Sequence, residues 1–150
     1  MTSKAAIDDF LSQRTLAIAG MSRSGRKFGN SIYREMRSKG YRLLPIHPHA
    51  QEIDGDPCWP SIAELPEPVD GIILVVRPDQ TEKLVQEAAK AGIRRIWMQQ
   101  GTVSEAALSF CQANGVEPIH GECILMFAEP VGWFHGIHRW IWRVLGKLPR

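Results

Sequence analysis

The chain has 150 residues, of which 44% are hydrophobic and 23% are charged, with 18 basic and 16 acidic side chains. These proportions are typical of a globular protein and exclude a disordered or fibrous chain. The formal net charge of +2 is small and its cations are dispersed, so we expect no nucleic acid partner.

Cysteine usage and the N-terminus indicate a reducing compartment. The three cysteines, Cys58, Cys111 and Cys123, lie far apart without a CxxC pair, which argues against disulfides and structural zinc. The first residues lack the apolar stretch of a signal peptide, and no window approaches a membrane span. We therefore expect a cytoplasmic protein without a metal or a membrane partner.

Between residues 16 and 120, short apolar runs alternate with segments of helical period, which predicts parallel strands joined by crossover helices. The runs are continuously apolar, as in strands that helices cover on both faces. We therefore expect an α/β, three-layer, Rossmann-like doubly wound fold with a five-stranded parallel sheet. The expected strands are Leu16–Ala19, Arg42–Ile46, Gly71–Val76, Arg95–Gln99 and Val116–His120.

The connecting helices have recognisable ends. A short helix is expected over Ala5–Gln13, and Ser104 is placed to cap the helix before the last strand. Three glycines follow helix-like segments, where a left-handed residue closes a helix at low steric cost: Gly40, Gly92 and Gly115. The segment Gln51–Pro68 contains four prolines, so we expect an irregular connection with at most one helical turn.

The most informative segment is the loop after the first strand. Strand, glycine-containing loop and helix follow one another there, and the N-terminus of such a helix suits a phosphate. Serine hydroxyls and basic side chains add donors to the loop. The candidate ligand-binding residues are Gly20, Met21, Ser22, Arg23, Ser24, Arg26, Lys27, Phe28, Gly29 and Asn30.

The loop departs from the dinucleotide fingerprint G-x-G-x-x-G. Ser22 stands at the second glycine position, and more residues intervene before Gly29. The acidic residue expected after the second strand is also missing, because His47-Pro48-His49 occupies that place. NAD is therefore disfavoured, and NADP stays open as an alternative cofactor.

With Ile46-His47-Pro48 and Gly121-Glu122-Cys123, this loop resembles the small stand-alone CoA-binding domain proteins, which are similar to the nucleotide-binding domain of succinyl-CoA synthetase α subunits. The resemblance covers about residues 15–127. It implies that coenzyme A binds the loop, the turn at His47 and Pro48, and Cys123 near the pantetheine end. It further implies contacts at two strand ends, from Val76, Arg77, Pro78, Gln99, Gln100 and Gly101.

No catalytic constellation is apparent, since the chain lacks a nucleophile elbow, a zinc-protease motif and a convincing carboxylate pair. This favours a module that binds coenzyme A, or an acyl-CoA, without turnover. The alternative is an NADP- or acyl-CoA-dependent enzyme that uses the same site, with His47, Glu122 or Cys123 supplying chemistry.

We expect one domain over residues 1–150, with a core at about 15–127 and a helical extension at 130–150. In the extension, apolar and aromatic side chains recur every three or four residues, which predicts an amphipathic helix. We expect it to pack on its own domain or on a sister subunit in a homodimer. A peripheral membrane contact through residues 132–145 is the alternative.

Overall fold

The computed structural model describes residues 2–128, whose centre is a five-stranded parallel sheet in the order β2-β1-β5-β6-β7. The strands are β1 (Thr15–Ala19), β2 (Arg42–Ile46), β5 (Gly71–Leu74), β6 (Ile96–Met98) and β7 (Ile119–His120). The helices are α1 (Lys4–Leu11), α2 (Phe28–Ser38), α3 (Pro78–Lys90) and α4 (Glu105–Ala113), with 3-10 turns η1 (Ile62–Glu64) and η2 (Ile124–Met126).

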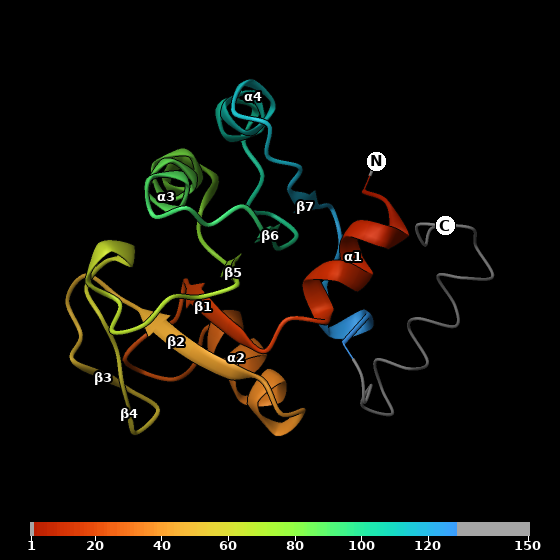
Figure 1. Ribbon diagram of the computed structural model, residues 1–150. Coiled ribbons are helices and arrows are strands. Elements are labelled where there is room, and N and C mark those ends of the chain that lie inside the picture. Colours follow the sequence, from red (N-terminus) through yellow and green to blue (C-terminus); the bar gives the residue numbers. More distant parts are fainter. Residues whose placement is uncertain (1, 129–150) are drawn as a thin grey trace.

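Helices cover both faces of the sheet. In β1, Leu16 and Ile18 belong to a buried cluster with residues of α1 and α2, whereas Ala17 and Ala19 pack with residues of α3 and α4. Figure 1 shows the same division, with α3 and α4 on one side of the sheet and α1 and α2 on the other. The predicted three-layer Rossmann-like fold is confirmed.

The predicted helix ends are confirmed at each glycine. Gly40, Gly92 and Gly115 all have positive φ, and each following amide donates to a carbonyl five residues earlier. This is the Schellman arrangement, which satisfies carbonyl groups at the end of a helix. At the start of α4, Ser104 Oγ accepts a hydrogen bond of 3.1 Å from the Ala107 amide, as its capping position predicts.

The prediction of an irregular connection after β2 was wrong for its first part. A small antiparallel hairpin forms there from β3 (Glu52–Ile53) and β4 (Asp56–Pro57). Asp54 and Gly55 join its strands with φ of 52° and 80°. A two-residue hairpin turn of type I′ needs positive φ at both central residues, and Asp-Gly is one of the sequences that adopt it readily. The only helical turn in the connection is η1.

Some predicted strands are shorter in the structure. β7 begins at Ile119 instead of Val116, because Pro118 has no N–H to donate to a ladder. β5 ends at Leu74, although the Val75 amide still donates to the Ala19 carbonyl at 2.9 Å. Pro45 is tolerated inside β2 because that strand lies at the edge of the sheet.

The strand order creates a switch point beside β1. The chain passes from β1 to β2 on one side and then crosses to β5 on the other side of β1. In open α/β sheets, ligands bind outside the carboxyl ends of strands at such a point. The loop after β1 is therefore in the position that the topology favours for a ligand.

The predicted helix over residues 130–150 lies outside the described residues, and so does the expected subunit or membrane contact of that segment. Within residues 2–128, no helix is long and apolar enough to cross a bilayer.

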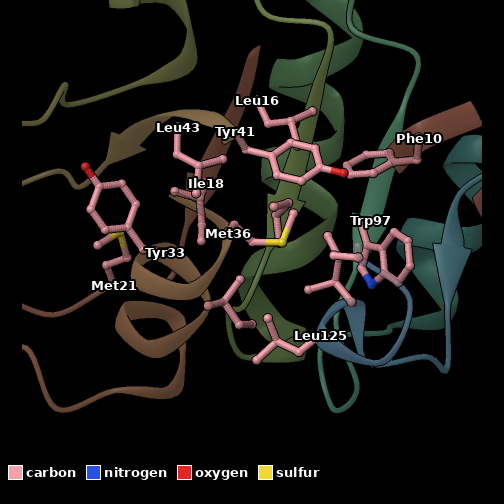
Figure 2. Packing of buried hydrophobic residues seen from close by; sticks show 14 of the residues in the cluster. Phe10, Leu16, Ile18, Met21, Tyr33, Met36, Tyr41, Leu43, Trp97 and Leu125 are labelled. Carbon is pink, nitrogen blue, oxygen red and sulfur yellow. The ribbon is translucent and has the colours of Figure 1, made fainter. Parts of the chain in front are cut away.

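A contact between α1 and β6 closes one side of the core. The rings of Phe10 and Trp97 pack edge to face with centroids 5.4 Å apart, and both side chains are almost fully buried (Figure 2). Phe10 comes from a helix that precedes the first strand, so this pair attaches α1 to the sheet.

Phe10→Ala is therefore expected to lower the free energy of unfolding by about 3–5 kcal/mol, the usual cost of truncating a buried phenylalanine. Denaturant unfolding measures this change. Phe110→Ala on α4 is the control, because that ring is only partly buried and should cost less. Equal losses in the two variants would show that α1 is not attached in this way.

Candidate functional site

Two glycines allow the loop after β1 to pass close to its neighbours. Gly20 has φ of +110°, and a Cβ there would lie 2.1 Å from the Val75 carbonyl oxygen. A Cβ at Gly29 would lie 2.5 Å from the Gly20 carbonyl oxygen. Neither distance is possible for a real side chain, so both residues must be glycine. The N-terminus of α2 thus packs directly against the end of β1.

Asn30 holds the loop in shape from inside. Its side chain is fully buried, Oδ1 accepts from the Ser22 amide at 2.8 Å, and Nδ2 donates to the Ser22 carbonyl at 3.0 Å. Met21 is also buried and belongs to the core cluster of Figure 2. Of the predicted site residues, these two therefore shape the loop from its buried side.

The β3–β4 hairpin supports the loop from outside. Asp54 Oδ2 accepts from Asn30 Nδ2 at 3.4 Å, and Asp54 Oδ1 pairs with Arg34 Nη2 at 3.3 Å. The same Arg34 nitrogen donates to the Gly25 carbonyl at 2.6 Å. Sequence reasoning missed Arg34 and Asp54, although the Asp54-Gly55 turn signal could have indicated the hairpin that presents the carboxylate.

The remaining loop side chains face solvent. Arg23, Ser24, Arg26 and Lys27 are exposed, and no side chain caps the N-terminus of α2. Phe28 begins the helix and is 50% exposed, the one exposed large hydrophobic side chain in residues 2–128. Cations, an aromatic ring and the positive end of a helix dipole thus lie together.

His47 follows β2 and lies close enough to this loop to sense its charges. Burial lowers the pKa of His47, and the charges of Arg23, His49 and Lys27 lower it further. The His49 amide donates to His47 Nδ1 at 3.0 Å, so the neutral ring carries its proton on Nε2. His47 therefore presents an N–H donor and gains a proton readily only when an anion is near.

The other predicted residues lie at the carboxyl ends of β5, β6 and β7. Arg77 and Pro78 open α3, and the exposed Arg77 pairs with Asp79 at 3.0 Å. Gln99 is buried, whereas Gln100 is exposed. Cys123 is a free thiol that is 7% exposed. The predicted residues thus lie along the carboxyl ends of the strands, and some of their side chains are buried whereas others are exposed.

A large cavity lies at the amino ends of the strands, away from the loop after β1. It measures about 620 Å³ and is lined by residues 61–69 and by the end of α3 with the turn that follows. Its position, before β5 begins, separates it from the loop after β1. Among residues 2–128, no group of three or more histidine, cysteine or carboxylate side chains is arranged to hold a metal ion.

Comparison with known proteins identifies the family. The CoA binding domain family matches residues 14–129. The uncharacterised protein YneT of Bacillus subtilis is 27% identical over 123 residues, which cover 81% of this chain and 91% of YneT. Acetate–CoA ligase (ADP-forming) I of Archaeoglobus fulgidus is 26% identical over 123 residues, but the match spans only 18% of that enzyme.

Solved structures agree with this assignment. A conserved hypothetical protein of Pyrococcus furiosus superposes with a TM-score of 0.70 at 40% identity, over 74% of this chain and 96% of that protein. A five-stranded parallel sheet with a glycine loop at its switch point is typical of nucleotide-binding α/β proteins. The chain belongs to the CoA-binding domain family.

The depressed pKa of His47 predicts how stability varies with pH. The unfolded chain binds this proton near the ordinary value of 6.5, whereas the folded chain binds it only at lower pH. The free energy of unfolding should therefore fall as pH drops through 6.5 and level off below the folded pKa. Unfolding of the ligand-free protein at several pH values measures this, and His47→Gln should reduce the slope. An unchanged slope in His47→Gln would contradict the lowering of the His47 pKa by burial and by the charges of Arg23, His49 and Lys27.

The hydrogen bonds of Asn30 predict a second outcome. Asn30→Leu removes an acceptor and a donor from the buried side of the loop, so the Ser22 amide and carbonyl lose their partner. We expect a loss of about 2–4 kcal/mol in the free energy of unfolding. Ser31→Leu, at the neighbouring exposed position of α2, should cost far less and serves as the control.

Proposed function

We propose that this chain binds coenzyme A or an acyl-CoA, with the diphosphate of the ligand on the loop between β1 and α2. The observation that carries the proposal is the group of exposed cations at the uncapped N-terminus of α2, around the Nε2–H donor of His47. Backbone amides, a helix dipole and mobile cations together are a familiar arrangement for a diphosphate. Membership of the CoA-binding domain family supports the choice of ligand.

Different residues in and near the loop are expected to contact different parts of the ligand. Arg23, Lys27 and His47 supply charge and donors for phosphate groups, and the exposed ring of Phe28 suits stacking on the adenine. Ser22 and Ser24, whose hydroxyl oxygens lie 3.0 Å apart, add short donors. Gly20, Gly29 and Asn30 keep the loop backbone in place without contacting the ligand through side chains.

We further propose a binding or regulatory module without turnover of its own. The enzyme alternative would need catalytic groups near the site, and His47, Glu122 and Cys123 are the candidates. NADP gains no support from the family or from the relatives. The relatives that are acetate–CoA ligases are much longer than this chain, so their activity is not carried over.

The cytoplasm and a homodimer remain part of the proposal. Three free cysteines, all buried, suit a reducing compartment. Sedimentation of the intact protein would test the dimer, and deletion of residues 130–150 should release monomers or cause aggregation.

The direct test of ligand choice is thermal unfolding with CoA, NADP, NAD or ATP at equal concentration. CoA should raise the melting temperature most, since a ligand at a hundred times its Kd stabilises the native state by about 2.7 kcal/mol. Equal or absent shifts with CoA would exclude the proposal.

Variants test the location of the site. Arg23→Ala and Lys27→Ala should each weaken CoA binding about fivefold, as for loss of one exposed ionic contact worth about 1 kcal/mol, and more strongly at low salt. Lys83→Ala, an exposed residue on α3, is the control and should bind as the wild type does. Equal affinities in all three variants would place the phosphates elsewhere.

A further inference from the structure

The segment after β7 is held firmly by side chains of β6 and the residues that follow it. The hydrogen bonds run from Trp97 Nε1 to the Glu122 carbonyl (3.2 Å), from the Ile124 amide to Gln99 Oε1 (3.1 Å), and from Gln100 Nε2 to the Gly121 carbonyl (3.3 Å). Three side chains thus fix the backbone of residues 121–124, and the position of Glu122 is set before any ligand arrives.

The carboxyl group of Glu122 is left without a partner in this ordered segment. Glu122 is only 9% exposed, and its Oε2 is the one buried side-chain nitrogen or oxygen in residues 2–128 without a hydrogen bond. Burial also raises the pKa of Glu122. An unsatisfied buried polar atom is costly, by about 1–3 kcal/mol, and points to a group that completes it.

Because the strands are parallel, Glu122 and the loop after β1 both lie at the carboxyl ends of the strands. Glu122 follows β7, which lies three strands from β1 in the order β1-β5-β6-β7. Neighbouring strands are about 4.8 Å apart, so the ends of β1 and β7 are separated by roughly 14 Å. A ligand that reaches both positions needs a phosphate group and a long extended arm.

We infer that Glu122 binds the amide end of the pantetheine arm of coenzyme A and thereby distinguishes this ligand from nucleotides that lack the arm. The inference rests on the proposed function, which places the diphosphate at the loop after β1. An extended pantetheine arm that crosses the ends of β5 and β6 reaches β7. An amide offers a donor and an acceptor, so it matches Glu122 Oε2 whether the carboxyl is protonated or ionised.

The test compares CoA with 3′-phospho-ADP, which is CoA without its pantetheine arm. Isothermal titration gives both affinities for the wild type, Glu122→Ala, Glu122→Gln and Glu117→Ala. Glu117 is exposed and lies before β7, so its variant is the matched control. Glu122→Ala should weaken CoA about fivefold to tenfold and leave 3′-phospho-ADP unchanged, as for loss of one hydrogen bond. Glu122→Gln keeps a donor and an acceptor and should stay closer to the wild type.

The remaining outcomes separate the inference from the proposed function. An equal loss for both ligands, or no loss, overturns the inference and leaves the proposed function standing. The same holds if the wild type binds 3′-phospho-ADP as tightly as CoA. A wild type that binds neither ligand overturns the proposed function, and the inference with it.

A second measurement serves if Glu122→Ala does not fold. The carboxyl carbon of Glu122 can be followed by NMR in the wild type with labelled glutamate, and Glu122→Gln assigns the signal. CoA should shift this signal and 3′-phospho-ADP should not. A signal that CoA leaves in place would overturn the inference, because the ligand would then not contact the carboxyl group of Glu122.

Discussion

The close passage of the loop after β1 between β5 and α2 is the constraint on which the site depends. A Cβ at Gly20 would lie 2.1 Å from the Val75 carbonyl oxygen, and one at Gly29 would lie 2.5 Å from the Gly20 carbonyl oxygen. Because both positions lack side chains, the first turn of α2 packs on the end of β1. Asn30 and Asp54 then hold the loop from two sides. A loop ordered in advance loses less entropy when it binds a ligand.

The site has two ends of different character. Near β1 and β2, exposed cations offer charge to an anion and His47 offers an N–H donor, and screening by salt will affect the cations. Near β7, Glu122 is buried on a backbone that β6 fixes. A ligand with a charged nucleotide part and a long neutral arm suits this division. The cavity of about 620 Å³ is lined by residues that precede β5 and by the end of α3, apart from the proposed phosphate site.

The strands and helix ends that were predicted correctly are specified by residues close together in the sequence. A continuous apolar run specifies a buried parallel strand, and β2 has the predicted bounds, Arg42–Ile46. Glycine after a helix and serine before one act within a single turn, so Gly40 and Ser104 were placed correctly. The β3–β4 hairpin was not predicted, because the prolines in residues 51–68 indicate an irregular connection while only the Asp54-Gly55 pair signals the turn.

The features that were not predicted depend on contacts between distant segments. Asn30 was predicted as a site residue from its place in the loop, whereas the hydrogen bonds of its side chain to the Ser22 backbone were not predicted. Arg34 joins the loop through Gly25 and the hairpin through Asp54, which no spacing in the sequence reveals. The buried position of Glu122 was not predicted either, because it depends on hydrogen bonds from residues 97–100 to the segment after β7.

The central claim is that coenzyme A binds along the carboxyl edge of the sheet, and mapping amide shifts by NMR during a CoA titration tests it most directly. The account predicts the largest shifts at residues 22–30, His47 and His49, with further shifts at 121–124. Shifts concentrated at residues 61–69 and 87–93, around the large cavity, would contradict it.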